Sequence, residues 1–131
     1  MAKGKVLLID DEVDVREVLK LHLSEENYQI IEAENGEEAI ELLNSGDNMI
    51  NVGVILCDIR MPKVNGIECI QYLRKEAPGI PIVVVTGFND PELMQGLLKI
   101  GVKDYLVKPV KKDMLISVVN KQVTEKEGVD L

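Results

Sequence analysis

The sequence predicts an α/β fold, in which a doubly wound parallel sheet of five strands carries helices on both faces. Five short apolar segments alternate with segments whose apolar residues recur at helical spacing. The chain has 131 residues, of which 46% are hydrophobic, and this is enough for the core of one domain. We expect that domain to cover residues 1–123, followed by a polar tail or the start of a linker over 124–131.

The predicted strands are short and mostly apolar. The first is apolar throughout and the third is apolar except for Gly53, as is typical of parallel strands that are buried on both faces. The second and the fourth are rich in β-branched residues, and Pro81 opens the fourth. The five predicted strands are Val6–Ile9, Tyr28–Ala33, Val52–Cys57, Ile82–Val85 and Tyr105–Val107.

The predicted helices follow these strands in turn. In the first helix, Val15, Val18 and Leu19 lie at helical spacing and form its apolar stripe. The fourth helix begins with Pro91, a residue favoured in the first turn, and stops at Gly101. The predicted helices cover 12–25, Gly36–Leu43, Ile67–Lys75, 91–100 and Lys112–Val123, with a loop over 44–48.

Charge and composition argue against several classes of partner. The net charge is −8, from 15 basic and 23 acidic residues, which disfavours direct binding of nucleic acid by this domain. No apolar run approaches the roughly 18 residues of a membrane helix. Cys57 and Cys69 form no CxxC motif, and we expect both to be buried free thiols in a reducing, cytoplasmic compartment.

Polar residues follow four of the five predicted strands at their carboxyl ends. Asp10 and Asp11 follow the first strand, Asp58 the third, Thr86 the fourth and Lys108 the fifth. The carboxyl ends of parallel strands meet at one edge of the sheet. In open α/β sheets, ligands bind at that edge. Three carboxylates without histidine or cysteine favour Mg²⁺ (or Mn²⁺) over zinc, and a lysine and a hydroxyl suit phosphate. No glycine-rich nucleotide loop is present in the sequence.

Four motifs in this order carry a resemblance to a known family. VLLIDDE, CDIRMPKVNG, IVVVTG and KDYLVKP resemble the receiver domain of bacterial two-component response regulators (CheY-like), over about residues 5–123. The resemblance implies a flavodoxin-like sheet with the strand order 2-1-3-4-5. That order places the two strands that end in aspartates beside each other.

The family resemblance also implies a role for each residue at this edge. Asp58 is expected to be the phosphoacceptor, a nucleophile that takes a phosphoryl group from a sensor histidine kinase or a phosphotransfer protein. Asp11, Asp58 and the main-chain carbonyl of Arg60 are expected to bind Mg²⁺ directly, and Asp10 through water. The Mg²⁺ ion and Lys108 are expected to neutralise charge on the transferring group.

The resemblance implies a switch as well. Thr86 is expected to bond the phosphoryl group, with Tyr105 turning inward behind it, and the Lys108–Pro109 peptide bond is expected to be cis. The domain would then be a signalling switch rather than a metabolic enzyme, catalysing only its own phosphorylation and dephosphorylation.

The expected partner surface combines the helix over 91–100, the strand Tyr105–Val107 and the helix Lys112–Val123. It would contact an output domain or a downstream protein, and a homodimer is possible. Gly96 lies inside the first of these helices, where glycine costs roughly 1 kcal/mol relative to alanine. We therefore expect this helix to be marginally stable and easily moved.

Three alternatives compete with these expectations. Asp10 and Asp11 fit the acidic start of a helix, but that explains neither Asp58 nor Lys108. A phosphohydrolase with an aspartyl nucleophile needs an acid two positions later, where this chain has Arg60, a poor proton donor. A flavodoxin-like cofactor binder is disfavoured by three acids where a phosphate would rest.

Overall fold

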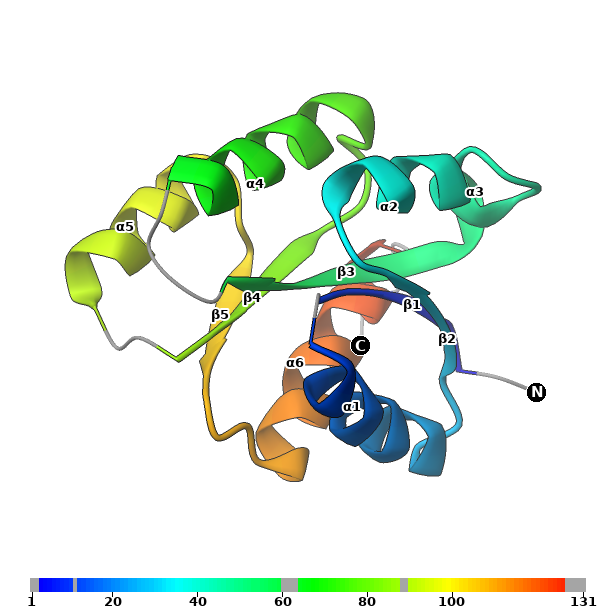
Figure 1. Ribbon diagram of the computed structural model, residues 1–131. Coiled ribbons are helices and arrows are strands. Elements are labelled where there is room, and N and C mark those ends of the chain that lie inside the picture. Colours follow the sequence, from blue (N-terminus) through cyan, green and yellow to red (C-terminus); the bar gives the residue numbers. More distant parts are fainter. Residues whose placement is uncertain (1–2, 11, 60–63, 88–89, 127–131) are drawn as a thin grey trace.

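The computed structural model describes residues 3–10, 12–59, 64–87 and 90–126. The strands are β1 (Lys5–Ile9), β2 (Gln29–Ala33), β3 (Val52–Ile59), β4 (Ile82–Thr86) and β5 (Asp104–Val107). They form one parallel sheet in the order β2-β1-β3-β4-β5 (Figure 1). The predicted fold class and strand order are therefore confirmed.

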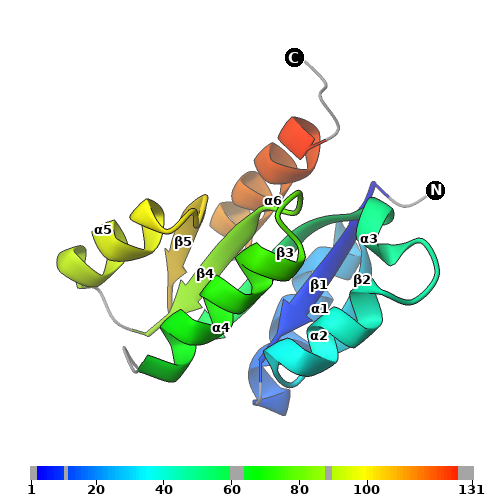
Figure 2. The same cartoon turned by 90° about the horizontal axis from the view of Figure 1, so that it is seen from above.

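Helices cover both faces of this sheet. They are α1 (Val13–Glu25), α2 (Gly36–Leu43), α3 (Asn48–Asn51), α4 (Val64–Glu76), α5 (Pro91–Lys99) and α6 (Lys112–Lys126). Helices α1 and α6 lie against one face, and α2, α4 and α5 lie against the other (Figures 1 and 2). Helix α4 begins earlier than predicted, and α6 continues to Lys126, into the predicted tail.

The short helix α3 was not predicted, because its first residue was assigned to a loop. Its start is held by the side chain of Asn48, which donates a hydrogen bond to the carbonyl of Leu42 at 2.8 Å and accepts one from Lys5 Nζ at 2.8 Å. Both partners lie outside the helix, in other elements. A four-residue helix set by such contacts has too few residues to show a helical period in the sequence.

The sheet divides the apolar core into two layers. Along β1, Leu7 and Ile9 pack into the layer beneath α2, α4 and α5, whereas Val6 and Leu8 pack into the layer beneath α1 and α6. This alternation is the period of two that a strand imposes on its side chains. It explains why the predicted strands are apolar at nearly every position.

The apolar stripe of α1 differs from the predicted one. Val18 is 53% exposed, so its assignment to the core-facing stripe is wrong. Leu19 and Leu23 are buried instead, and residues four positions apart lie on the same face of a helix. Val15, also four positions from Leu19, packs against the same core layer.

Two strands run further than predicted, and this positions the polar residues at their ends. β3 ends at Ile59 and β4 at Thr86, so Asp58 and Thr86 lie inside the ladder rather than in the following loops. Asp58 is paired with Val85. The side chains at this edge are therefore held on regular strands, which fixes their positions more firmly than a loop would.

Candidate functional site

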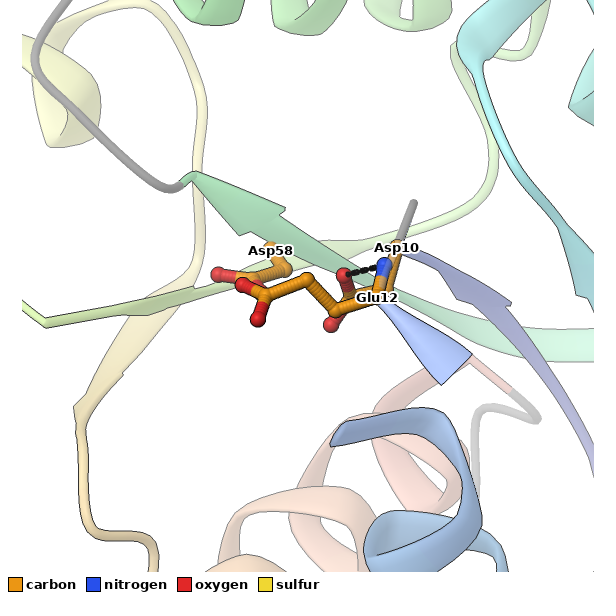
Figure 3. A group of neighbouring side chains, drawn as sticks. All are labelled: Asp10, Glu12 and Asp58. Atoms are coloured by element: carbon orange, nitrogen blue, oxygen red, sulfur yellow. Dashed lines mark hydrogen bonds between the residues drawn. The ribbon is translucent and has the colours of Figure 1, made fainter. Parts of the chain in front are cut away.

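Three carboxylates converge at the carboxyl edge of the sheet. Asp10 follows β1, Glu12 precedes α1 and Asp58 lies near the end of β3 (Figure 3). One carboxylate oxygen from each residue lies within 4.8 Å of the others, a grouping that can hold a metal ion. Of the predicted metal ligands, the structure brings Asp10 and Asp58 together. Glu12 was not predicted, although it is the third acid of the run DDE, and that run was the signal for it.

The end of β1 is held by hydrogen bonds on both sides of Asp10. Its N–H donates to the carbonyl of Ala33 at 3.1 Å, and its carbonyl accepts from Arg16 at 2.6 Å. Arg16 also lies 3.4 Å from the carboxylate of Glu32. Its guanidinium therefore ties the start of α1 to the ends of two strands.

The side chain of Asp10 has two differently placed oxygens. Oδ1 accepts a hydrogen bond from the N–H of Glu12 at 2.8 Å, as an acid beside a helix start often does. The alternative interpretation of Asp10, as an acid at the start of a helix, accounts for the hydrogen bond of Oδ1 alone. Oδ2 of Asp10 and Oδ1 of Asp58 are buried and have no hydrogen-bond donor among the described residues. A buried acceptor without a donor costs free energy of folding. A cation bound between these two oxygens would interact with both of them.

The electrostatic surroundings of Asp10 favour its protonated form. Asp10 is only 3% exposed, and burial is the largest cause that raises its pKa, followed by the adjacent carboxylate of Asp58. Together they raise the pKa of Asp10 to about 7, against the opposing effects of the Glu12 N–H and Lys108. Near neutral pH the site therefore has a strong tendency to take up a positive charge, either as a proton or as a metal ion.

Lys108 supplies a fixed positive charge on the other side of Asp58. Its Nζ lies 2.6 Å from Asp58 Oδ2, and the side chains of Lys108 and Asp58 are 25% and 2% exposed. The Lys108 N–H donates to the carbonyl of Thr86 at 2.8 Å, and the Lys108–Pro109 peptide bond is cis. The carboxylate of Asp58 therefore contacts an ammonium and also lies beside the acidic cluster.

The remaining predicted residues lie at different distances from this centre. Thr86 is fully buried at the end of β4, next to β3, where it is paired with Ile59. Tyr105 is half-buried in β5 and packs against the core layer beneath α4 and α5. Asp11 and Arg60, both predicted to bind the metal directly, lie outside the described residues.

Comparison with known proteins places this geometry in a family. The protein-family model of the response regulator receiver domain matches residues 6–120 of this chain. The chain belongs to that family. It is thus a receiver domain of two-component signalling, and its homologues include transcriptional regulators.

Curated relatives resemble the chain over only part of their own length. The transcriptional regulatory protein YdfI of Bacillus subtilis is 38% identical over 114 residues, which are 86% of this chain and 51% of YdfI. A cyclic di-GMP phosphodiesterase of Thermotoga maritima is 34% identical over 110 residues, covering 84% of this chain and 28% of that protein. The chain spans about half or less of the length of the curated relatives it matches.

Solved receiver domains match over nearly their whole length. A response regulator receiver domain from Clostridium thermocellum superposes with a TM-score of 0.82 at 26% identity, covering 95% of this chain and 97% of that one. The Francisella response regulator 1452 receiver domain superposes with a TM-score of 0.80 at 32% identity, covering 94% of this chain and 98% of that one. Within the described residues, no helix has the length and apolar character needed to cross a membrane.

Proposed function

We propose that this receiver domain is a phosphorylation-dependent switch in which Asp58 accepts a phosphoryl group from a sensor histidine kinase or a phosphotransfer protein. The observation that carries the proposal is the environment of the Asp58 carboxylate. Oδ2 is paired with Lys108 at 2.6 Å, Oδ1 is buried without a donor among the described residues, and the carboxylate lies beside those of Asp10 and Glu12. One oxygen is thus held by a cation, and the other has no hydrogen-bond donor among the described residues.

The transfer itself needs a nucleophilic oxygen and compensation of negative charge. A carboxylate oxygen of Asp58 forms the new bond to phosphorus as the bond to the donor's imidazole nitrogen breaks, which gives an acyl phosphate. Lys108 lies where it neutralises charge on the oxygens of the moving group. The hydroxyl of Thr86, at the adjacent strand end, is assigned to bind the phosphoryl group once it is attached.

Mg²⁺ (or Mn²⁺) is the metal that this site fits. An all-oxygen set with two donorless buried oxygens suits a hard cation. Asp58, Asp11 and the Arg60 carbonyl are assigned to direct contact with the metal. Asp10 is assigned to contact through a water molecule. Glu12 lies close enough to the other acids to take part. When bound, the metal supplies further neutralisation of phosphoryl charge.

The output of the switch is assigned to the surface of α5, β5 and α6, which faces an output domain or a downstream protein in the cytoplasm. Phosphorylation adds a charge of about −1.5 to −2 and strong acceptor oxygens. These favour a state in which Thr86 and Lys108 turn toward the phosphoryl group and Tyr105 follows. The change is a population shift, limited by the difference in contacts between the two states.

Intact-mass spectrometry with acetyl phosphate tests the proposal. In the presence of Mg²⁺ we expect one added phosphoryl group on the wild-type protein and none on Asp58→Asn. Asp104→Asn serves as the matched control, because Asp104 begins β5 and lies outside the acidic cluster. Addition to Asp58→Asn at the wild-type rate, or no addition to the wild type with any small phosphodonor, would contradict the proposal.

A further inference from the structure

Two thiols meet beside the candidate phosphorylation site. Cys57 lies on β3 directly before Asp58, is 3% exposed and belongs to the core layer beneath α2 and α4. Cys69 lies on α4 and packs against the same layer, where its thiol neighbours that of Cys57. Both cysteines are free. The prediction of burial is confirmed for Cys57 but is wrong for Cys69, which is only half-buried.

The sulfur of Cys69 also touches the start of a second helix. A Cβ atom built on Gly36 would lie 2.9 Å from Cys69 Sγ, so a side chain at position 36 would displace the sulfur. Gly36 is the first residue of α2, so the sulfur lies at the start of that helix. Helix N-termini stabilise thiolates, because their free N–H groups and the helix dipole favour negative charge.

These contacts change the chemistry of Cys69. The hydrogen bond from Cys57 lowers the pKa of Cys69 to about 7, with help from the Gly36 N–H and against partial burial. A thiol with a pKa near ambient pH is close to the optimum for attack, because thiolate is abundant and still nucleophilic.

Cys69 can be reached from solvent, whereas Cys57 cannot. A groove between α2 and α4 is lined by Cys69, with Glu37, Glu41 and Glu68 around it. The three carboxylates repel anionic reagents and leave small neutral molecules as the suitable reactants. The groove thus exposes one sulfur and keeps its partner behind it.

We propose that Cys57 and Cys69 are a redox-active dithiol, which hydrogen peroxide converts to an intramolecular disulfide between β3 and α4. The Cys69 thiolate attacks one peroxide oxygen and becomes a sulfenic acid, releasing hydroxide. The Cys57 sulfur then attacks the Cys69 sulfur, and the sulfenic oxygen leaves as water with the Cys57 proton. The two thiols lose two electrons in total, and one peroxide becomes two waters. A small neutral thiol reductant reverses the reaction.

The proposal goes beyond the phosphorylation switch and does not depend on it. Its readouts are thiol counts and masses, so it fails or holds whether or not Asp58 accepts a phosphoryl group. The disulfide would fix α4 to the strand that carries Asp58, at the residue directly before it.

Peroxide treatment of the full chain followed by alkylation in denaturant tests the proposal. The wild type is expected to lose both thiols, to stay monomeric on a non-reducing gel and to yield a linked peptide containing Cys57 and Cys69. Cys57→Ser is expected to accumulate a sulfenic acid at Cys69, which dimedone traps. Cys69→Ser is expected to lose its remaining thiol at least about tenfold more slowly than wild type, since burial keeps that thiol inert.

A second measurement uses the unaltered chain, so that misfolding of a variant cannot decide the outcome. Under native conditions, iodoacetamide is expected to modify Cys69 at least about tenfold faster than Cys57, as peptide mapping would measure. Equal rates at the two positions, or two intact thiols after peroxide treatment, would overturn the proposal. So would a disulfide that forms only between chains.

Discussion

The ammonium of Lys108 lies 2.6 Å from one carboxylate oxygen of Asp58, although the two residues are 50 positions apart in the chain. The contact joins the ends of β3 and β5, which are separated in the sheet by β4. The carboxylate of Asp58 also lies beside those of Asp10 and Glu12. Asp58 is therefore a buried carboxylate between a positive and a negative group, and this arrangement makes several predictions.

Removing the charge of Lys108 should slow phosphorylation without weakening metal binding. Lys108→Met keeps most of the side-chain length, and we expect phosphorylation by acetyl phosphate at saturating Mg²⁺ to fall by about tenfold or more. Mg²⁺ should bind at least as tightly as in wild type, because a nearby repelling charge is gone.

The matched control for this prediction is Lys112→Met. Lys112 is a partly exposed lysine on α6 that pairs with Glu25 and Glu26, away from the site. Its variant should keep the wild-type phosphorylation rate, measured by intact mass over time. Equal rates for Lys108→Met and Lys112→Met would remove Lys108 from the transfer step.

The raised pKa of Asp10 predicts a pH-dependent stability in the absence of divalent metal. The folded protein holds the Asp10 proton up to a pKa of about 7, whereas the unfolded chain releases it near 3.8. Asp10 therefore contributes most to the stability of the folded state, relative to the unfolded chain, when it is protonated in both states, below about pH 3.8. This contribution is lost progressively as the pH rises to about 7. The loss is at most about 4 kcal/mol.

Urea denaturation in EDTA, compared between wild type and Asp10→Asn, measures this effect. The variant cannot ionise at position 10. Its free energy of unfolding should therefore rise relative to that of wild type between about pH 4 and pH 7 and remain higher at more alkaline pH. A difference between the two proteins that does not change with pH would show that burial of Asp10 does not hold its proton.

The acids of the cluster should differ in their importance for Mg²⁺. Asp11 is expected to contact the metal directly and Asp10 through water, so Asp11→Ala should weaken binding more than Asp10→Ala. For a water-mediated contact we expect a loss of about tenfold. The affinity can be measured from the gain in unfolding free energy as Mg²⁺ is added. A larger loss in Asp10→Ala would reverse the assignment of the two residues.

Two glycines offer a matched test of helix α5. A Cβ added at Gly96 or at Gly46 would meet nothing within 4 Å, but Gly46 has φ of +57° whereas Gly96 lies inside α5. Gly96→Ala should therefore stabilise the protein by about 0.5–1 kcal/mol, and Gly46→Ala should destabilise it.

Hydrogen exchange should then locate the effect of the Gly96 substitution. If Gly96 keeps α5 marginal, its amides are less protected than those of the other helices in wild type, and alanine raises their protection. Unchanged protection in Gly96→Ala, or α5 as the best-protected helix of the wild type, would contradict the idea that this glycine keeps the helix mobile.

The sheet and its edge could be predicted because their signals are local. An apolar run followed at once by a polar residue marks both a buried strand and its end, and parallel strands bring such ends together. Asp10, Asp58, Thr86 and Lys108 were found in this way. Glu12 was missed because it was assigned to the predicted helix over 12–25, where an acid in the first turn is ordinary.

Features that depend on distant partners could not be predicted. The exposure of Cys69 is set by the groove between α2 and α4, and its neighbours Cys57 and Gly36 belong to other elements. No pattern within α4 indicates either partner. The short helix α3 is likewise held by contacts with other elements, through the side chain of Asn48.

The central claim is that Asp58 itself becomes the acyl phosphate, and chemical mapping of the phosphorylated residue tests it most directly. The protein is treated with acetyl phosphate and Mg²⁺, then with borohydride, which reduces an acyl phosphate to an alcohol and marks its position permanently. We predict that peptide sequencing by mass spectrometry finds homoserine at position 58 and that omission of Mg²⁺ removes the mark. Homoserine at another aspartate, or a mark that persists in Asp58→Asn, would contradict the account.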